Sequence, residues 1–61
     1  MLTPRETEIV KLIIKGMLNK QIALNLGITE HTVKNHIRGI FGKTGLSNRT
    51  QVAIKYAGGL K

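Results

Sequence analysis

The stretch from Asn19 to Arg38 constrains the fold more than any other part of this 61-residue chain. Three apolar residues recur there at one-turn spacing, as on one face of a helix: Ile22, Ala23 and Leu26. Gly27 ends this helix, because glycine readily takes the left-handed backbone, and Thr29 can cap the next one through its hydroxyl. Two steeply crossing helices need a small residue where they touch, so Ala23 favours a helix-turn-helix.

The helix that follows, predicted over residues 30–43, separates its apolar from its polar residues. The apolar face comprises Val33, Ile37, Ile40 and Phe41. The opposite stripe, at spacings of three, four and seven, comprises His31, Lys34, Asn35 and Arg38. Lysine and arginine donate to guanine O6 and N7, and asparagine pairs with adenine, so this stripe is predicted to contact DNA bases. The alternative is that this stripe is an ordinary solvent-exposed helix face. Such a face would also contain acidic residues, and none occurs between His31 and Lys43.

The charge balance also indicates a polyanionic partner. Ten Lys and Arg stand against three Glu, for a formal net charge of +7. Nucleic acid is the first candidate for such a surface and an acidic membrane is the second. A membrane-surface peptide would be one amphipathic helix, whereas several capped helices are predicted here. We therefore expect double-stranded DNA as the partner, and no membrane.

Length and composition exclude several kinds of site. A chain of 61 residues allows one domain, over 1–61, with no room for a cofactor-sized cavity. Without cysteine there is no disulfide and no thiolate ligand, as suits a cytoplasmic protein. The longest apolar run, Leu12-Ile13-Ile14, is too short to span a bilayer, and no signal peptide is visible.

The titratable residues indicate neither a metal site nor an enzyme. His31 and His36 lie on different helix faces with no Cys or Asp beside them, so no metal site is predicted. We interpret His36 as partly buried and hydrogen-bonded to the backbone or to a phosphate. The three Glu and two His show no pairing suited to proton transfer, so we predict no enzyme.

Capping residues and glycines divide the chain into an all-α, four-helix bundle. The predicted helices span residues 4–15, 19–26, 30–43 and 49–58. Thr3 and Glu6 form a capping box at the first, and Asn19 and Asn48 are the expected N-caps of the second and the last, the latter forming a second capping box with Gln51. Left-handed glycines are expected to end helices, at Gly16, Gly27 and Gly45. Gly58-Gly59 is expected to end the last helix, with Leu60 folding back.

Two further features concern the C-terminal half. Gly39 and Gly42 each cost a helix interior about 1 kcal/mol relative to alanine, so the third helix should fray unless tertiary packing holds it; close approach of another backbone would explain one of them. The last helix turns Val52, Ala53, Tyr56 and Ala57 towards the core. Its more exposed edge, which is either scattered surface or half of a two-fold contact, comprises Thr50, Ile54 and Ala57.

Four motifs follow one another along nearly the whole chain: Leu2-Thr3-Pro4-Arg5-Glu6, Gly16 with Asn19-Lys20-Gln21-Ile22-Ala23, Thr32-Val33-Lys34-Asn35-His36, and Asn48-Arg49-Thr50-Gln51. Together they resemble the DNA-binding domain of the LuxR/GerE family of bacterial transcription regulators, which includes the output domains of NarL-type response regulators. The resemblance implies that Lys34, Asn35 and Arg38 approach bases. It also implies a phosphate-contacting set, which we take to be Lys20, Thr29, Thr32 and Arg49, and a dimer edge at Thr50, Ile54 and Ala57. Family members usually carry this domain behind a receiver or ligand-binding domain.

The predicted function is thus sequence-specific DNA binding by a transcription regulator. Phosphate contacts would supply affinity and base contacts discrimination. A dimer would place two recognition helices about 34–36 Å apart on an inverted repeat. We expect a weak homodimer that DNA stabilises, with RNA polymerase as a possible further partner. Two alternatives stay open: a promoter-binding region like that of a sigma factor, and a protein-interaction module that uses Ile54.

Overall fold

The computed structural model describes residues 1–58, and these form four helices and no strand. The helices are α1 (Pro4–Ile14), α2 (Asn19–Leu26), α3 (Glu30–Thr44) and α4 (Arg49–Tyr56). The all-α, four-helix class is therefore confirmed. Three predicted ends were off by one or two residues: α1 stops before Lys15, α3 includes Thr44, and α4 stops before Ala57. No helix within residues 1–58 has the length and apolar character needed to cross a membrane.

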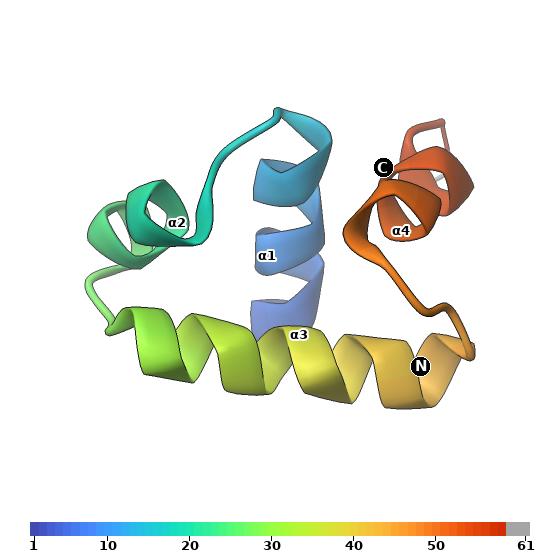
Figure 1. Cartoon of the computed structure of the whole chain (residues 1–61), viewed down its shortest axis with the longest axis horizontal. Helices are drawn as coiled ribbons and strands as arrows, with labels where there is room; N and C mark the ends of the chain where they lie inside the picture. The colour runs from blue at the N-terminus through green and yellow to red at the C-terminus, as the bar shows by residue number, and fades with distance from the viewer. Residues whose placement is uncertain (59–61) are drawn as a thin grey trace.

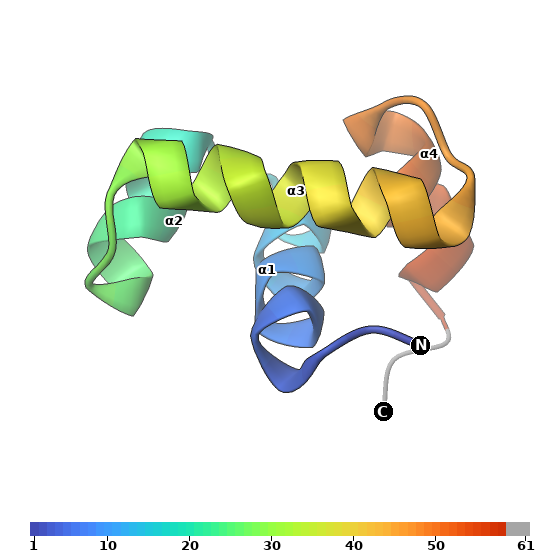
Figure 2. The same cartoon turned by 90° about the horizontal axis from the view of Figure 1, so that it is seen from below.

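The longest helix, α3, lies along one side of the molecule, and α1, α2 and α4 all stand on the same side of it (Figures 1 and 2). The extensive helix contacts are those of α1 with α4, α2 with α3, and α1 with α3. In Figure 2, α3 crosses in front of the other three helices. One long surface of α3 is consequently left without a packing partner in the described chain.

The core is formed where the apolar faces of the four helices meet. Its buried members are Ile9, Val10, Leu12, Ile13, Ile22, Ala23, Val33, Ile37, Ile40 and Val52. The prediction for α3 is confirmed at Val33, Ile37 and Ile40, whereas Phe41 is only half-buried. The predicted inward position of Ala57 was wrong: it lies one residue beyond α4 and is exposed.

The helix ends follow the capping signals, with corrections. Thr3 and Glu6 form the predicted capping box, with Thr3 N to Glu6 Oε1 at 2.8 Å and Glu6 N to Thr3 Oγ1 at 3.1 Å. Gly16, Gly27 and Gly45 have left-handed φ values of 84°, 69° and 72°. Asn19, however, does not cap α2; it is the first helical residue, and the N–H of Leu18 before it donates to Gln21 Oε1.

The cap of α4 is partly as predicted. Asn48 Oδ1 accepts from Gln51 N at 2.9 Å, which confirms Asn48 as the N-cap. The predicted capping box also requires Gln51 Oε1 to accept from the N–H of Asn48. Gln51 Oε1 instead accepts from Ser47 N at 2.9 Å. The predicted end of this helix at Gly58-Gly59, and the fold-back of Leu60, fall partly or wholly on residues outside the described range.

The C-terminal half of α3 is held against α1 by a buried carboxylate. Glu6 is 5% exposed, and its Oε1 accepts from Lys43 Nζ at 2.7 Å. The hydrogen bond from Lys43, and then that from the Thr3 N–H, lowers the pKa of Glu6, although burial acts in the opposite direction. A Cβ at Gly39 would lie 2.9 Å from Glu6 Oε2, so a side chain and not a backbone explains this glycine. Nothing in the structure explains Gly42.

Candidate nucleic-acid interface

The unpacked surface of α3 carries the predicted polar stripe. Thr29 caps the helix by accepting from Thr32 N at 3.1 Å, which sets where α3 begins and hence the register of its faces. Because Val33, Ile37 and Ile40 face the core, the residues on the opposite side of α3 face outwards. All four predicted base contacts are exposed: His31, Lys34, Asn35 and Arg38. This surface is free to enter a groove, and it carries cationic and amide donors.

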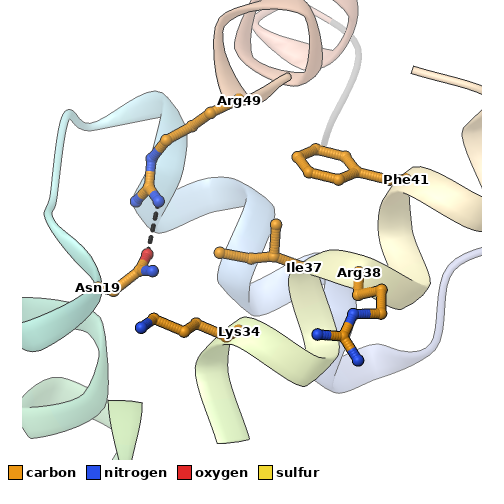
Figure 3. A pocket seen from close by; sticks show the side chains of 6 residues that line it. All are labelled: Asn19, Lys34, Ile37, Arg38, Phe41 and Arg49. Carbon is orange, nitrogen blue, oxygen red and sulfur yellow. Dashed lines mark hydrogen bonds between the residues drawn. The ribbon is translucent and has the colours of Figure 1, made fainter. Parts of the chain in front are cut away.

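A pocket of about 340 Å³ adjoins this surface (Figure 3). Its lining comprises Asn19, Lys34, Ile37, Arg38, Phe41 and Arg49. Ile37 and Phe41 supply apolar surface, while the other side chains bring donors from three helices. An apolar surface surrounded by cations can accept the methyl edge of a base together with neighbouring negative charge. The sequence did not predict that Asn19 and Phe41 belong to this site.

Arg49 links two elements within this pocket. Its Nη1 donates to Asn19 Oδ1 at 2.5 Å, and its Nη2 donates to the carbonyl of Met17 at 2.6 Å. Figure 3 shows the guanidinium reaching from α4 towards Asn19. The side chains of Arg49 and Asn19 are 30 residues apart in sequence, so no local pattern could have indicated this contact.

The other predicted phosphate contacts lie near the starts of α2 and α3. Lys20 is exposed in the first turn of α2. At the start of α3, the hydroxyls of Thr29 and Thr32 are 3.0 Å apart and share one hydrogen bond. Since each hydroxyl has one hydrogen, that bond leaves one O–H available to an external acceptor.

The last group of predicted residues lies on α4 and just beyond its end at Tyr56. Thr50, Ile54 and Ala57 are all exposed, and Ile54 is 73% exposed.

His36 is half-buried, as predicted. Within residues 1–58, no cluster of three or more His, Asp or Glu side chains has an arrangement that could hold a metal ion.

Comparison with known proteins places this geometry in a family. The model of the family described as bacterial regulatory proteins, luxR family, matches residues 1–56. The nitrate/nitrite response regulator protein NarL of Escherichia coli K12 is 49% identical over 53 residues, which are 87% of this chain and 24% of NarL. The transcriptional regulatory protein LiaR of Bacillus subtilis strain 168 is 51% identical over 53 residues, 87% of this chain and 25% of LiaR.

A solved structure agrees with the sequence relatives. The response regulator ChrA of a heme-sensing two-component system superposes with a TM-score of 0.88 at 38% identity, covering 93% of this chain and 28% of that one. The chain thus spans about a quarter of the length of the relatives it matches. With its helix-turn-helix, its exposed basic stripe and this match over residues 1–56, the chain belongs to the luxR family of bacterial regulatory proteins.

Proposed function

We propose that this chain binds double-stranded DNA sequence-specifically, as the DNA-binding domain of a bacterial transcription regulator, with α3 in the major groove. One observation carries the proposal: α1, α2 and α4 all stand on one side of α3, and the predicted stripe of donor side chains is exposed. A major groove about 12 Å wide admits one helix presented in this way. The net charge of +7 supports the same partner, because phosphate neutralisation supplies much of the affinity for DNA.

Base recognition is assigned to the four exposed side chains of the stripe. Lys34 and Arg38 are one turn apart and would donate to guanine O6 and N7, and Asn35 between them would pair with adenine. His31 lies nearest the start of α3 and would contact the edge of the same half-site. These assignments follow from exposure and hydrogen-bonding chemistry.

Phosphate contacts are assigned to side chains beside the stripe. Lys20 supplies an exposed positive charge at the start of α2, and the Thr29–Thr32 pair supplies a hydroxyl donor at the start of α3. The positive end of the α3 dipole adds to the attraction for a phosphate there. Arg49 is left out of this set, because it is half-buried and its guanidinium is held by two hydrogen bonds within the chain.

Dimerisation is assigned to the exposed edge of α4. Thr50, Ile54 and Ala57 offer a small contact that two copies related by a two-fold axis could share. So small an edge buries little area, so the free chain should be a monomer or a weak dimer, and two half-sites on one duplex would bring two copies together. Occupation of a promoter or contact with RNA polymerase would then regulate transcription.

The test is selection from a random pool of duplex DNA at two salt concentrations. If the chain binds DNA sequence-specifically as a dimer, an inverted repeat should be enriched at moderate salt. A Lys34→Ala variant should lose enrichment, whereas Lys15→Ala, which removes the same charge from an exposed position at the end of α1, should keep it. Salt-sensitive binding without any enriched sequence would refute the proposal. It would instead favour a protein-interaction module, for which the exposed Ile54 is the candidate contact.

A further inference from the structure

Arg49 occupies an unusual position for a basic residue of a DNA-binding domain. It is the first residue of α4, yet its side chain leaves that helix and ends on the α1–α2 connection and the start of α2. The side chain is half-buried, unlike Lys34 and Arg38, which line the same pocket but are exposed. The guanidinium of Arg49 is therefore already bound within the chain, whereas a side chain that binds only phosphate would be exposed to solvent in the free protein.

The geometry of the contact uses what distinguishes arginine from lysine. A guanidinium is planar and presents its N–H groups in a rigid fork, whereas an ammonium is a point charge with three donors. Here the two terminal nitrogens serve two acceptors at once, the side-chain carbonyl of Asn19 and the backbone carbonyl of Met17. These two bonds use two of the five guanidinium N–H groups and hold the group in one orientation, so only the remaining N–H groups could meet a phosphate there.

The contact also joins two helices, α4 and α2, that have no extensive packing against each other. The extensive packing of α4 is against α1, and that of α2 is against α3. Arg49 fastens the start of α4 directly to the start of α2. Lys20, the proposed phosphate contact, directly follows Asn19, and Lys34 lines the same pocket. Ile54, on the proposed dimer edge, lies on the helix that Arg49 begins.

We infer that Arg49 is a positioning residue of the DNA interface, which through Asn19 and Met17 sets α4 relative to the start of α2, and that it does not act by neutralising a phosphate. This inference rests on the proposed function. Its consequence is that the helix proposed for dimerisation and the helices proposed to read DNA have a fixed relative placement. The spacing of two half-sites then depends on this link as well as on the dimer contact.

The test compares Arg49→Lys with Lys20→Gln in binding to the duplex that the selection enriches. Arg49→Lys keeps the charge and removes the fork. For a positioning residue, it should weaken specific binding by roughly 2- to 30-fold, the range of energetic coupling between packed elements. The slope of log affinity against log salt should stay at the wild-type value. Lys20→Gln, the control, should make that slope shallower by about 0.9. Wild-type affinity of Arg49→Lys, with loss of affinity and slope only in Arg49→Gln, would overturn the inference in favour of a phosphate contact.

A second measurement tests the link without DNA. The side-chain amide of Asn19 gives its own signals in a nitrogen-15 NMR spectrum, and Arg49→Lys should shift them while the remaining spectrum shows an intact fold. Asn19→Ala should also weaken DNA binding, and the double variant should be no weaker than Arg49→Lys alone, because both substitutions remove the bond between Arg49 and Asn19. If the losses of DNA-binding free energy in the two single variants added up in the double variant, the inference would be overturned. Failure of the unaltered chain to enrich any sequence would refute the proposed function itself, a result that these variants do not affect.

Discussion

Substitution of the two glycines of α3 by alanine should affect stability differently. Both lie inside one helix, Gly39 facing Glu6 and Gly42 facing open space. Alanine at either position removes backbone entropy from the unfolded chain and favours the helix by about 1 kcal/mol. Gly42→Ala is therefore expected to stabilise the domain by about 0.5–1 kcal/mol, and it serves as the matched control.

At Gly39 the same gain is offset by displacement of the Glu6 carboxylate. The new Cβ would lie 2.9 Å from Glu6 Oε2, and Glu6 is 5% exposed with little room to move. Its other oxygen already accepts from Thr3 N at 2.8 Å and from Lys43 Nζ at 2.7 Å. Disturbance of a helix cap costs about 0.5–2 kcal/mol. The net effect of Gly39→Ala should therefore range from a gain of about 0.5 kcal/mol to a loss of about 1.5 kcal/mol. The two variants should differ by the cost of the disturbed cap, about 0.5–2 kcal/mol.

Urea unfolding followed by circular dichroism at 222 nm measures this difference. In a domain of this size, 1 kcal/mol corresponds to about 4–8 °C in Tm, so thermal unfolding provides a second reading. Equal stabilisation by Gly39→Ala and Gly42→Ala would refute the argument. It would mean that the Glu6 carboxylate moves aside freely and does not hold the C-terminal half of α3.

Three further predictions concern the interface and pH. Lys34→Ala should weaken binding to the selected duplex by about 1–3 kcal/mol and bring it closer to binding of random DNA; equal weakening on both, measured by titration, would make this lysine a phosphate contact. Ile54→Asp should leave folding and half-site binding intact, because Ile54 is 73% exposed, and weaken binding to a duplex with two half-sites; unfolding in circular dichroism would instead place Ile54 in the core. Because the folded-state pKa of Glu6 is lowered from 4.5, its contribution to stability is present above pH 4.5 and is lost as pH falls through the folded-state pKa. Urea midpoints between pH 7 and pH 3 should therefore fall more steeply for wild type than for Glu6→Gln, and parallel curves would contradict this role.

Much of the fold was predictable because its signals are local. The capping box of Thr3 and Glu6, the left-handed glycines and the spacing of Val33, Ile37 and Ile40 all act within one or two helical turns, and each has its predicted structural role. The exposure of the stripe follows from the same spacing, since residues opposite a buried face must lie outside.

Errors arose where two roles competed for one residue. Asn19 has the side chain of a good N-cap, but its oxygen accepts from Arg49, and Gln21 satisfies the Leu18 N–H that precedes it. Ala57 suits a buried or an exposed face equally by its size, and the end of α4 at Tyr56 decides that it is exposed.

The sequence by itself determined the four helices, the apolar faces that form the core and the basic stripe that those faces leave outside. Only the tertiary structure decided that Glu6 lies against Gly39 and Lys43, and that Arg49 binds Asn19 and Met17. The physical reason is separation along the chain: these partners are 30 to 37 residues apart, and only the packing of helices brings them within hydrogen-bond distance.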